Sequence, residues 1–267
     1  MKPDYVHGYS AREQERLADQ AATLTSLLHC DTRYSPGAIV LEAGCGIGAQ
    51  TVILAGNSPE ASFVSVDISD EALAVAERRV QDAGLRNVTF RREDVFDLSF
   101  PAESFDHVFV CFVLEHLVGP ERALAELGRV LKTGGSLTAI EGDHGSAFFH
   151  PESDAARTAI QCLVDLQRQA GGDPNIGRRL FPLMTQNGFR DVIVSPRMVY
   201  ADASRPQMVD GFTRKTFTAM VEGVGKQAIE RQKIDPLAWA KGIQDLYRTA
   251  ESEGTFCYTF FKAIGRK

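Results

Sequence analysis

An apolar segment that runs into a glycine-rich turn constrains the fold of this chain more than any other feature. Residues 40–49 read VLEAGCGIGA, so the acid Glu42 precedes glycines at positions 44, 46 and 48. Glycine adopts backbone conformations that other residues avoid, and it lets the main chain approach a ligand closely. The first N–H groups of a helix that follows such a turn point at the same ligand. The sequence therefore predicts a strand, a ligand-binding turn and a helix at this point.

The segments around this turn alternate between strand-like and helix-like patterns over the first 145 residues. Apolar runs such as 39–41 and 107–114 alternate with amphipathic segments such as 71–83. Strands buried on both faces read as unbroken apolar runs, and strands that alternate with helices form parallel sheets. The predicted class is α/β, a doubly wound (Rossmann-like) and mostly parallel sheet. Gly134–Gly135 is expected to turn the chain into the fifth strand, over 136–141.

The pattern changes after residue 145, where we expect helical caps and a C-terminal antiparallel strand pair. Helical stretches at 151–170 and 176–187 precede an alternating segment at 192–200, and an aromatic, β-rich segment at 255–263 is expected to pair beside it. About fifty residues, 202–253, join these two strands. A hairpin does not need so long a connection, and long insertions in compact domains usually form lids or binding loops. We interpret this insertion as a substrate cap.

Composition and charge argue against several classes of partner. Of 267 residues, 44% are hydrophobic and 24% are charged, as in a globular protein with a large core. The net charge of −6 leaves no excess of lysine and arginine for a nucleic-acid backbone. The longest apolar run, 108–114, is far too short to cross a membrane, and the charged N-terminus lacks the apolar stretch of a secretory signal. We expect no nucleic-acid partner and no membrane partner.

The five cysteines add a prediction about the compartment. They are scattered, odd in number and never paired as C-x-x-C. That pattern fits reduced thiols, and it gives neither a disulfide framework nor a zinc site. We therefore expect a cytoplasmic protein without a metal.

Two classes of nucleotide ligand fit the glycine turn. The spacing Gly44-x-Gly46-x-x-Ala49, with Asp67 after the next strand, formally matches the dinucleotide fingerprint of nicotinamide and flavin enzymes. Glu42 favours a different ligand, because a carboxylate just before the glycines repels a pyrophosphate and attracts an ammonium or sulfonium group. The expected ligand is cationic near Glu42, and a dinucleotide is the alternative.

The ordered motifs of residues 38–141 resemble those of the class I S-adenosylmethionine-dependent methyltransferases. After the glycine turn follow VSVDIS at 64–69, REDV at 92–95, SFDHV at 104–108, VLEHL at 113–117 and LKTGG at 131–135. Within that family the chain is most similar in character to the ubiquinone and menaquinone methyltransferases, which act on small molecules. The resemblance covers about two-fifths of the chain and implies S-adenosylmethionine as the cofactor.

The resemblance implies a set of cofactor-binding residues in the N-terminal segment and at the ends of the first four strands: Tyr9, Glu42, Gly44, Cys45, Gly46, Gly48, Asp67, Ile68, Asp94, Val95 and Cys111. Asp67 is expected to accept hydrogen bonds from both ribose hydroxyls, and Asp94 to accept one from the adenine amino group. Glu42 is expected near the methionine ammonium, and the backbone carbonyl of Cys111 near the methyl-bearing sulfur. Tyr9 is expected to fold over the pocket, with a plain packing contact as the alternative.

Candidates for acceptor chemistry follow the fifth strand. The stretch EGDHG at 141–145 places His144 beside two acids at the carboxyl end of a strand, where α/β proteins form ligand crevices. A histidine in such a place accepts a proton near neutral pH. We expect Asp143 and His144 to supply a general base, with His116 as a further candidate. The alternative for Asp143 and His144 is a turn that only caps the helix at 151–170, and for His116 a structural role is the alternative.

The whole pattern predicts a single methyltransferase domain over 1–267. Residues 1–30 form an N-terminal helical lid, 31–145 the cofactor-binding core, and 146–175 and 202–253 the cap insertions. The predicted function is transfer of a methyl group from S-adenosylmethionine to a small-molecule acceptor by in-line displacement. Two alternatives stay open: an NAD(P)-dependent oxidoreductase, and a catalytically inactive S-adenosylmethionine-binding partner subunit. No oligomeric state is predicted.

Overall fold

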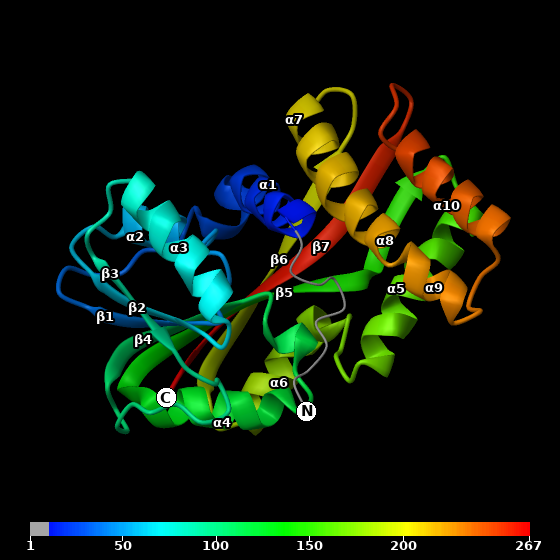
Figure 1. Cartoon of the computed structure of the whole chain (residues 1–267). Coiled ribbons are helices and arrows are strands. Elements are labelled where there is room, and N and C mark those ends of the chain that lie inside the picture. The colour runs from blue at the N-terminus through cyan, green and yellow to red at the C-terminus, as the bar shows by residue number, and fades with distance from the viewer. Residues whose placement is uncertain (1–10) are drawn as a thin grey trace. The chain divides into compact units, whose positions relative to one another are not determined.

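The strand β1 (Ile39–Ala43) that leads into the glycine turn lies inside a sheet, between β2 and β4. The structure is a computed structural model that describes residues 11–267. Within those residues seven strands form one sheet in the order β3-β2-β1-β4-β5-β7-β6 (Figure 1). Val40 and Leu41 are both fully buried, although neighbouring side chains of a strand point to opposite faces. Both faces of β1 are therefore covered, as its unbroken apolar run predicts.

The other strands are β2 (Ser62–Asp67), β3 (Val88–Arg92), β4 (Phe105–Cys111), β5 (Leu131–His150), β6 (Arg190–Ala201) and β7 (Thr255–Arg266). The pairs β1–β2, β1–β4, β2–β3 and β4–β5 are parallel. The end of β7 runs antiparallel to the start of β5, because Gly134 N–H donates to Lys267 O and Lys267 N–H donates to Gly135 O. The predicted fold class, a mostly parallel Rossmann-like sheet with antiparallel C-terminal strands, is confirmed.

Helices connect these strands. The α-helices are α1 (Ala11–His29), α2 (Thr51–Asn57), α3 (Asp70–Asp82), α4 (Pro120–Val130), α5 (Asp154–Gln169), α6 (Leu180–Gln186), α7 (Pro206–Met208), α8 (Ala219–Gly223), α9 (Gly225–Glu230) and α10 (Pro236–Arg248). Two 3₁₀ helices, η1 (Leu114–His116) and η2 (Ile176–Arg179), and one π-helical segment, η3 (Val209–Thr218), complete the set in residues 11–267.

The chain divides into two compact units. We call the first the glycine-turn unit; it consists of Thr25–Gly142, Ile176–Pro196 and Phe261–Lys267. The second, the aromatic unit, consists of Asp143–Asn175, Arg197–Phe260 and the described part of Met1–Leu24. The single-domain assignment, with its lid, core and cap boundaries, stays a prediction.

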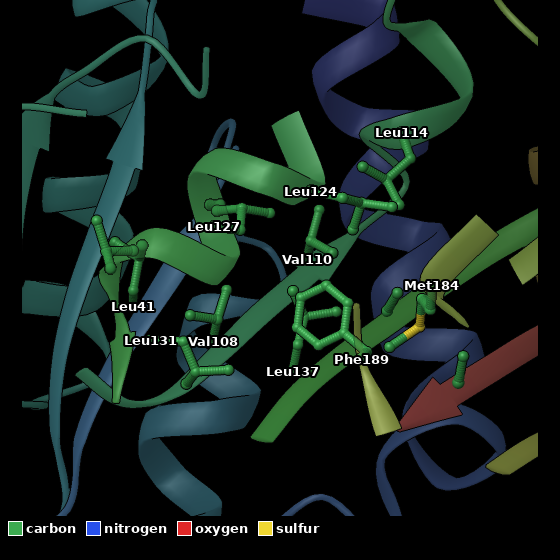
Figure 2. Packing of buried hydrophobic residues seen from close by; sticks show 14 of the residues in the cluster. Leu41, Val108, Val110, Leu114, Leu124, Leu127, Leu131, Leu137, Met184 and Phe189 are labelled. Atoms are coloured by element: carbon green, nitrogen blue, oxygen red, sulfur yellow. The ribbon is translucent and has the colours of Figure 1, made fainter. Parts of the chain in front are cut away.

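Figure 2 shows the apolar core of the glycine-turn unit. Leu124 and Leu127 of α4 pack with Val108 and Val110 of β4 in this cluster, which also contains Met184 of α6. The apolar face of α4 and the apolar side chains of β4 therefore pack against each other. This core fixes β4, and with it the turn that follows Cys111.

The core of the aromatic unit contains a cluster of aromatic side chains. Phe217 lies 4.7 Å from Phe256 and 5.4 Å from Tyr258, measured between ring centroids. Phe212 lies 5.6 Å from Tyr258 and 5.8 Å from Phe260. The aromatic residues at the start of β7 therefore pack against the π-helical segment, within this unit.

Two strand boundaries differ from the sequence prediction. β5 begins at Leu131 and does not begin after Gly134–Gly135, because the ladder shifts between the pairs Phe105/Leu131 and His107/Ser136 and absorbs the extra residues. It also continues to His150 instead of ending at Glu141. β4 ends at Cys111 instead of Leu114, because Phe112 has a φ of +57° and leaves the strand direction.

Candidate cofactor-binding and active site

The three glycines of the turn have different reasons to be glycine. Gly44, Gly46 and Gly48 all have positive φ, at 73°, 51° and 74°. A Cβ on Gly44 would lie 2.5 Å from Val113 Cγ2, and one on Gly48 would lie 2.8 Å from Ala76 Cβ. A Cβ on Gly46 would meet nothing within 4 Å. Two glycines thus serve close packing, and the middle one faces open space that a ligand can approach.

Asp67, the last residue of β2, is tied to this turn. Its Oδ2 accepts a hydrogen bond of 2.8 Å from Gly46 N–H, and its Oδ1 accepts one of 3.0 Å from Ser69 N–H. Each carboxylate oxygen accepts two hydrogen bonds, so each keeps a lone pair for a further donor. The carboxylate is half-buried and already oriented, as binding of a diol requires.

Glu42 lies behind the turn and is almost completely buried. Its Oε2 accepts hydrogen bonds of 2.7 Å from Thr51 Oγ1 and 2.6 Å from Ser65 Oγ. Burial raises the pKa of Glu42 to about 7; the hydroxyls of Ser65 and Thr51 oppose that rise, and Asp67 adds to it. The group therefore titrates near neutral pH, and a cation bound beside it favours the ionised form.

The next acid lies at the end of β3, the neighbour of β2. Asp94 is exposed, and its Oδ1 accepts a hydrogen bond of 2.9 Å from Phe96 N–H. Val95 packs partly against the apolar core, while Ile68 exposes 49% of its surface. Ile68 therefore offers exposed apolar surface directly after Asp67, and apolar side chains commonly line ligand sites.

Two of the predicted residues are cysteines with buried thiols. Burial raises the pKa of Cys45 and of Cys111 well above the ordinary thiol value, so both stay protonated. Only their backbone groups are left for a polar role. Cys162 and Cys257 are also buried, whereas Cys30 is exposed.

The cofactor-binding residues predicted from the sequence, except Tyr9, all belong to the glycine-turn unit. Tyr9 lies outside the described residues. The others lie at the carboxyl ends of β1, β2, β3 and β4 or directly after them, and these are adjacent parallel strands. Because the carboxyl ends of parallel strands meet at one edge, the sheet brings these residues together.

The three predicted catalytic residues do not belong to one unit. His116 lies in η1 of the glycine-turn unit, with its Nε2 3.6 Å from Glu115 Oε1. Asp143 and His144 belong to the aromatic unit. Their catalytic role, and that of His116, stays a prediction.

His144 is buried and held from several sides within the aromatic unit. Its Nδ1 lies 2.8 Å from the hydroxyl oxygen of Tyr258, and its backbone N–H donates to Pro174 O at 2.9 Å. The ring of Phe217 meets the imidazole edge-on at 6.5 Å. Asp143 Oδ1 accepts a hydrogen bond of 3.1 Å from Gly145 N–H. The contact between Tyr258 and His144 was not predictable from the sequence, because Tyr258 lies more than a hundred residues further along the chain.

Residues 11–267 contain no cluster of three or more His, Cys, Asp or Glu side chains that could hold a metal ion. Over the same residues, no helix has both the length and the apolar character that crossing a membrane requires.

Comparison with known proteins agrees with this geometry. The family model described as "Methyltransferase domain" matches residues 41–139. An uncharacterized 37.1 kDa protein in transposon TN4556 of Streptomyces fradiae is 30% identical over 239 residues, covering 88% of this chain and 67% of that protein. The demethylmenaquinone methyltransferase of Symbiobacterium thermophilum is 31% identical over 138 residues, covering 51% of this chain and 55% of that enzyme.

A solved structure supports the fold. Phosphoethanolamine N-methyltransferase 2 of Haemonchus contortus, in complex with S-adenosyl-L-methionine, matches with a TM-score of 0.56 at 19% identity, over 93% of this chain and 53% of that one. The chain spans about two thirds of the Streptomyces relative and about half of the Symbiobacterium one.

The fold and the glycine turn define a Rossmann-like protein whose glycine turn lies at the carboxyl edge of a parallel sheet, where proteins of this architecture bind their ligands. The chain belongs to the class I S-adenosylmethionine-dependent methyltransferases, and S-adenosylmethionine is the cofactor of this family. The resemblance stated from the sequence is thereby confirmed. The family match favours a methyltransferase over the alternative of an NAD(P)-dependent oxidoreductase.

Proposed function

We propose that this protein transfers the methyl group of S-adenosylmethionine to a small-molecule acceptor by in-line displacement. Two similar proteins, one of them similar in fold alone, carry small-molecule acceptors in their names, demethylmenaquinone and phosphoethanolamine. The helical insertion between β6 and β7 supports an enclosed acceptor, because long insertions commonly build binding sites. A cytoplasmic location and the absence of a nucleic-acid partner belong to the same proposal.

The cofactor site is proposed from the geometry of the glycine-turn unit. Asp67 accepts from the ribose hydroxyls with its remaining lone pairs, and Asp94 accepts from the adenine amino group. Glu42 Oε1, which accepts no hydrogen bond from the described residues, faces the methionine ammonium directly or through water. The open side of Gly46 leaves room for the ligand.

The remaining groups serve the acceptor. The bound cofactor supplies an electrophilic methyl group on a sulfonium. The chain contributes by holding acceptor and cofactor in line and by excluding water. His144, next to Asp143, takes a proton from acceptors that must lose one.

The orientation of Asp67 by Gly46 N–H and Ser69 N–H is the observation on which the proposal depends. Calorimetry with S-adenosylmethionine, S-adenosylhomocysteine, NAD and NADP tests it. We expect binding of the first two and none of the dinucleotides; the reverse pattern would overturn the proposal. A panel of phenols, quinols, amines and thiols as acceptors then tests the reaction, and turnover only with a protein or nucleic acid would contradict a small-molecule acceptor.

A further inference from the structure

Glu141 is a fully buried carboxyl group that the proposed cofactor site does not use. Its Oε1 accepts hydrogen bonds of 3.1 Å from Val113 N–H and 2.9 Å from Leu114 N–H, and its Oε2 accepts one of 3.4 Å from Glu115 N–H. One side chain on β5 therefore meets three consecutive backbone donors that follow β4.

The segment after β4 needs such a partner. Phe112 N–H donates the last ladder bond, of 2.9 Å, to Ile140 O of β5. Phe112 then takes a left-handed φ of +57°, and η1 begins at Leu114. The first N–H groups of a helix have no partner within the helix. Glu141 supplies acceptors for these groups. Burial, and then the nearby Glu115 carboxyl, raise the pKa of Glu141 well above its usual value, so its contribution is hydrogen bonding and not charge.

The position of this segment matters for the glycine turn. A Cβ on Gly44 would lie 2.5 Å from Val113 Cγ2, so the turn and Val113 are in direct contact. A shift of Val113 therefore either opens a gap beside Gly44 or presses on it. Interiors packed at this density transmit small displacements to their neighbours.

Glu141 is itself held in place by a distant part of the chain. A Cβ on Gly177 of η2 would lie 2.7 Å from Gly142 O and 2.9 Å from Glu141 O. The backbone of η2 therefore packs directly against β5 at Glu141 and Gly142. Because Glu141 cannot easily move, the segment that it holds cannot either.

We propose that Glu141 is a positioning residue for the cofactor: it fixes Val113–Glu115 against Gly44, and it sets cofactor affinity without touching the cofactor. The inference rests on the cofactor placement proposed above. It predicts that removing the carboxyl group weakens S-adenosylmethionine and S-adenosylhomocysteine equally, since the wall of the site moves for both.

The test compares Glu141→Leu with Glu141→Gln. Leucine removes every acceptor at similar volume, whereas glutamine keeps one accepting oxygen for Val113 N–H and Leu114 N–H. By calorimetry we expect the Kd of both ligands to rise roughly tenfold or more in Glu141→Leu, the effect of leaving one buried N–H group without its acceptor. Glu141→Gln is expected to lie between Glu141→Leu and the natural protein.

A matched control separates positioning from general loss of stability. Asp106 also accepts a backbone hydrogen bond, from Ile39 N–H at 2.8 Å, but it lies at the opposite end of β4. Asp106→Asn is expected to lower the Tm and leave both Kd values unchanged. A folded Glu141→Leu variant with natural affinity would overturn the inference, and so would weakening of S-adenosylmethionine alone, which indicates action on the sulfonium charge.

The natural protein provides a measurement that needs no variant. If Glu141 holds this segment, the amide protons of Val113 and Leu114 resonate downfield and exchange slowly with solvent, even without cofactor. Fast exchange at both would overturn the inference even where Glu141→Leu does not fold. Failure of the natural protein to bind either ligand would overturn the proposed function itself, and the inference with it.

Discussion

The carboxylate of Asp67 accepts a 2.8 Å hydrogen bond from the backbone N–H of Gly46. This bond joins the end of β2 to the middle of the glycine turn, and it makes the acid part of the turn's architecture before any ligand arrives. Asp67 therefore connects the shape of the glycine turn to the ribose-binding role that we propose for its carboxylate.

Asp67→Asn is expected to weaken S-adenosylmethionine roughly 10- to 100-fold, because the amide keeps one acceptor and loses the charge and the second. Calorimetry measures this Kd. Asp70→Asn is the control, because Asp70 is exposed in a loose ion pair of 3.5 Å with Arg92. An equal loss in both variants would show that charge near α3, and not the geometry of Asp67, controls binding.

Ionisation of Glu42 should change the stability of the protein and its affinity for the cofactor in opposite directions. Its pKa is about 7 in the folded protein against 4.5 ordinarily, so the folded state holds its proton more tightly than the unfolded state. The free energy of unfolding should therefore fall as pH rises from about 4.5 to about 7, by about 3 kcal/mol at most. Glu42→Gln removes this fall, which urea titrations at several pH values will detect as a difference between the two proteins.

Cofactor affinity should move the other way over the same range. The ammonium of the ligand favours ionised Glu42, so the Kd of S-adenosylmethionine should decrease as pH rises toward 7 and level off above it. In Glu42→Gln the Kd should be higher and insensitive to pH in this window. A pH-dependent Kd that survives the substitution would assign the effect to another group.

Gly46 and Gly48 should respond differently to alanine. Gly48→Ala places a Cβ 2.8 Å from Ala76 Cβ at a φ of +74°, and it should cost about 1–3 kcal/mol or more of stability. Gly46→Ala meets no protein atom within 4 Å and should cost only about 1 kcal/mol, the strain of a left-handed residue. Its methyl group occupies ligand space, so Gly46→Ala should lose more affinity than its small stability loss explains. Thermal unfolding and calorimetry, run on both variants, decide this.

His144→Asn tests the proposed base. With an acceptor that must lose a proton, kcat should fall roughly 10²- to 10⁴-fold while the Kd of S-adenosylmethionine stays unchanged. His150→Asn, near the end of the same strand and exposed, is the control and should leave kcat unchanged. If the His144→Asn variant is less stable but keeps the kcat of the natural protein, His144 has only a structural role beside Tyr258.

The sequence predicted the cofactor half of the fold well because its signals are local. A buried parallel strand is a short apolar run, and the acids at 42, 67 and 94 each stand next to one. The predicted cofactor-binding residues can therefore be found from the ends of the strands, because parallel strands bring their carboxyl ends to one edge of the sheet. The role of Glu141 was not predictable in this way, because its three donors come from a segment more than twenty residues earlier.

The same reasoning explains the errors at strand ends. Gly134–Gly135 is typical of a turn, and Gly134 does have a left-handed φ of +81°, but β5 includes both residues, and a Cβ on Gly135 would lie 2.6 Å from Asp106 O. The glycine serves a close approach between strands, which composition does not reveal. Likewise β4 ends early because Phe112 has a left-handed φ, and no neighbouring residue in the sequence predicts that conformation.

The distribution of thiols has a practical use. Four cysteines are buried in the protein interior, and Cys30 at the end of α1 is exposed. A maleimide dye should therefore attach at one position in the unaltered, folded chain, within the unit that carries the glycine turn. The protein comes with its own labelling point for fluorescence studies of ligand capture.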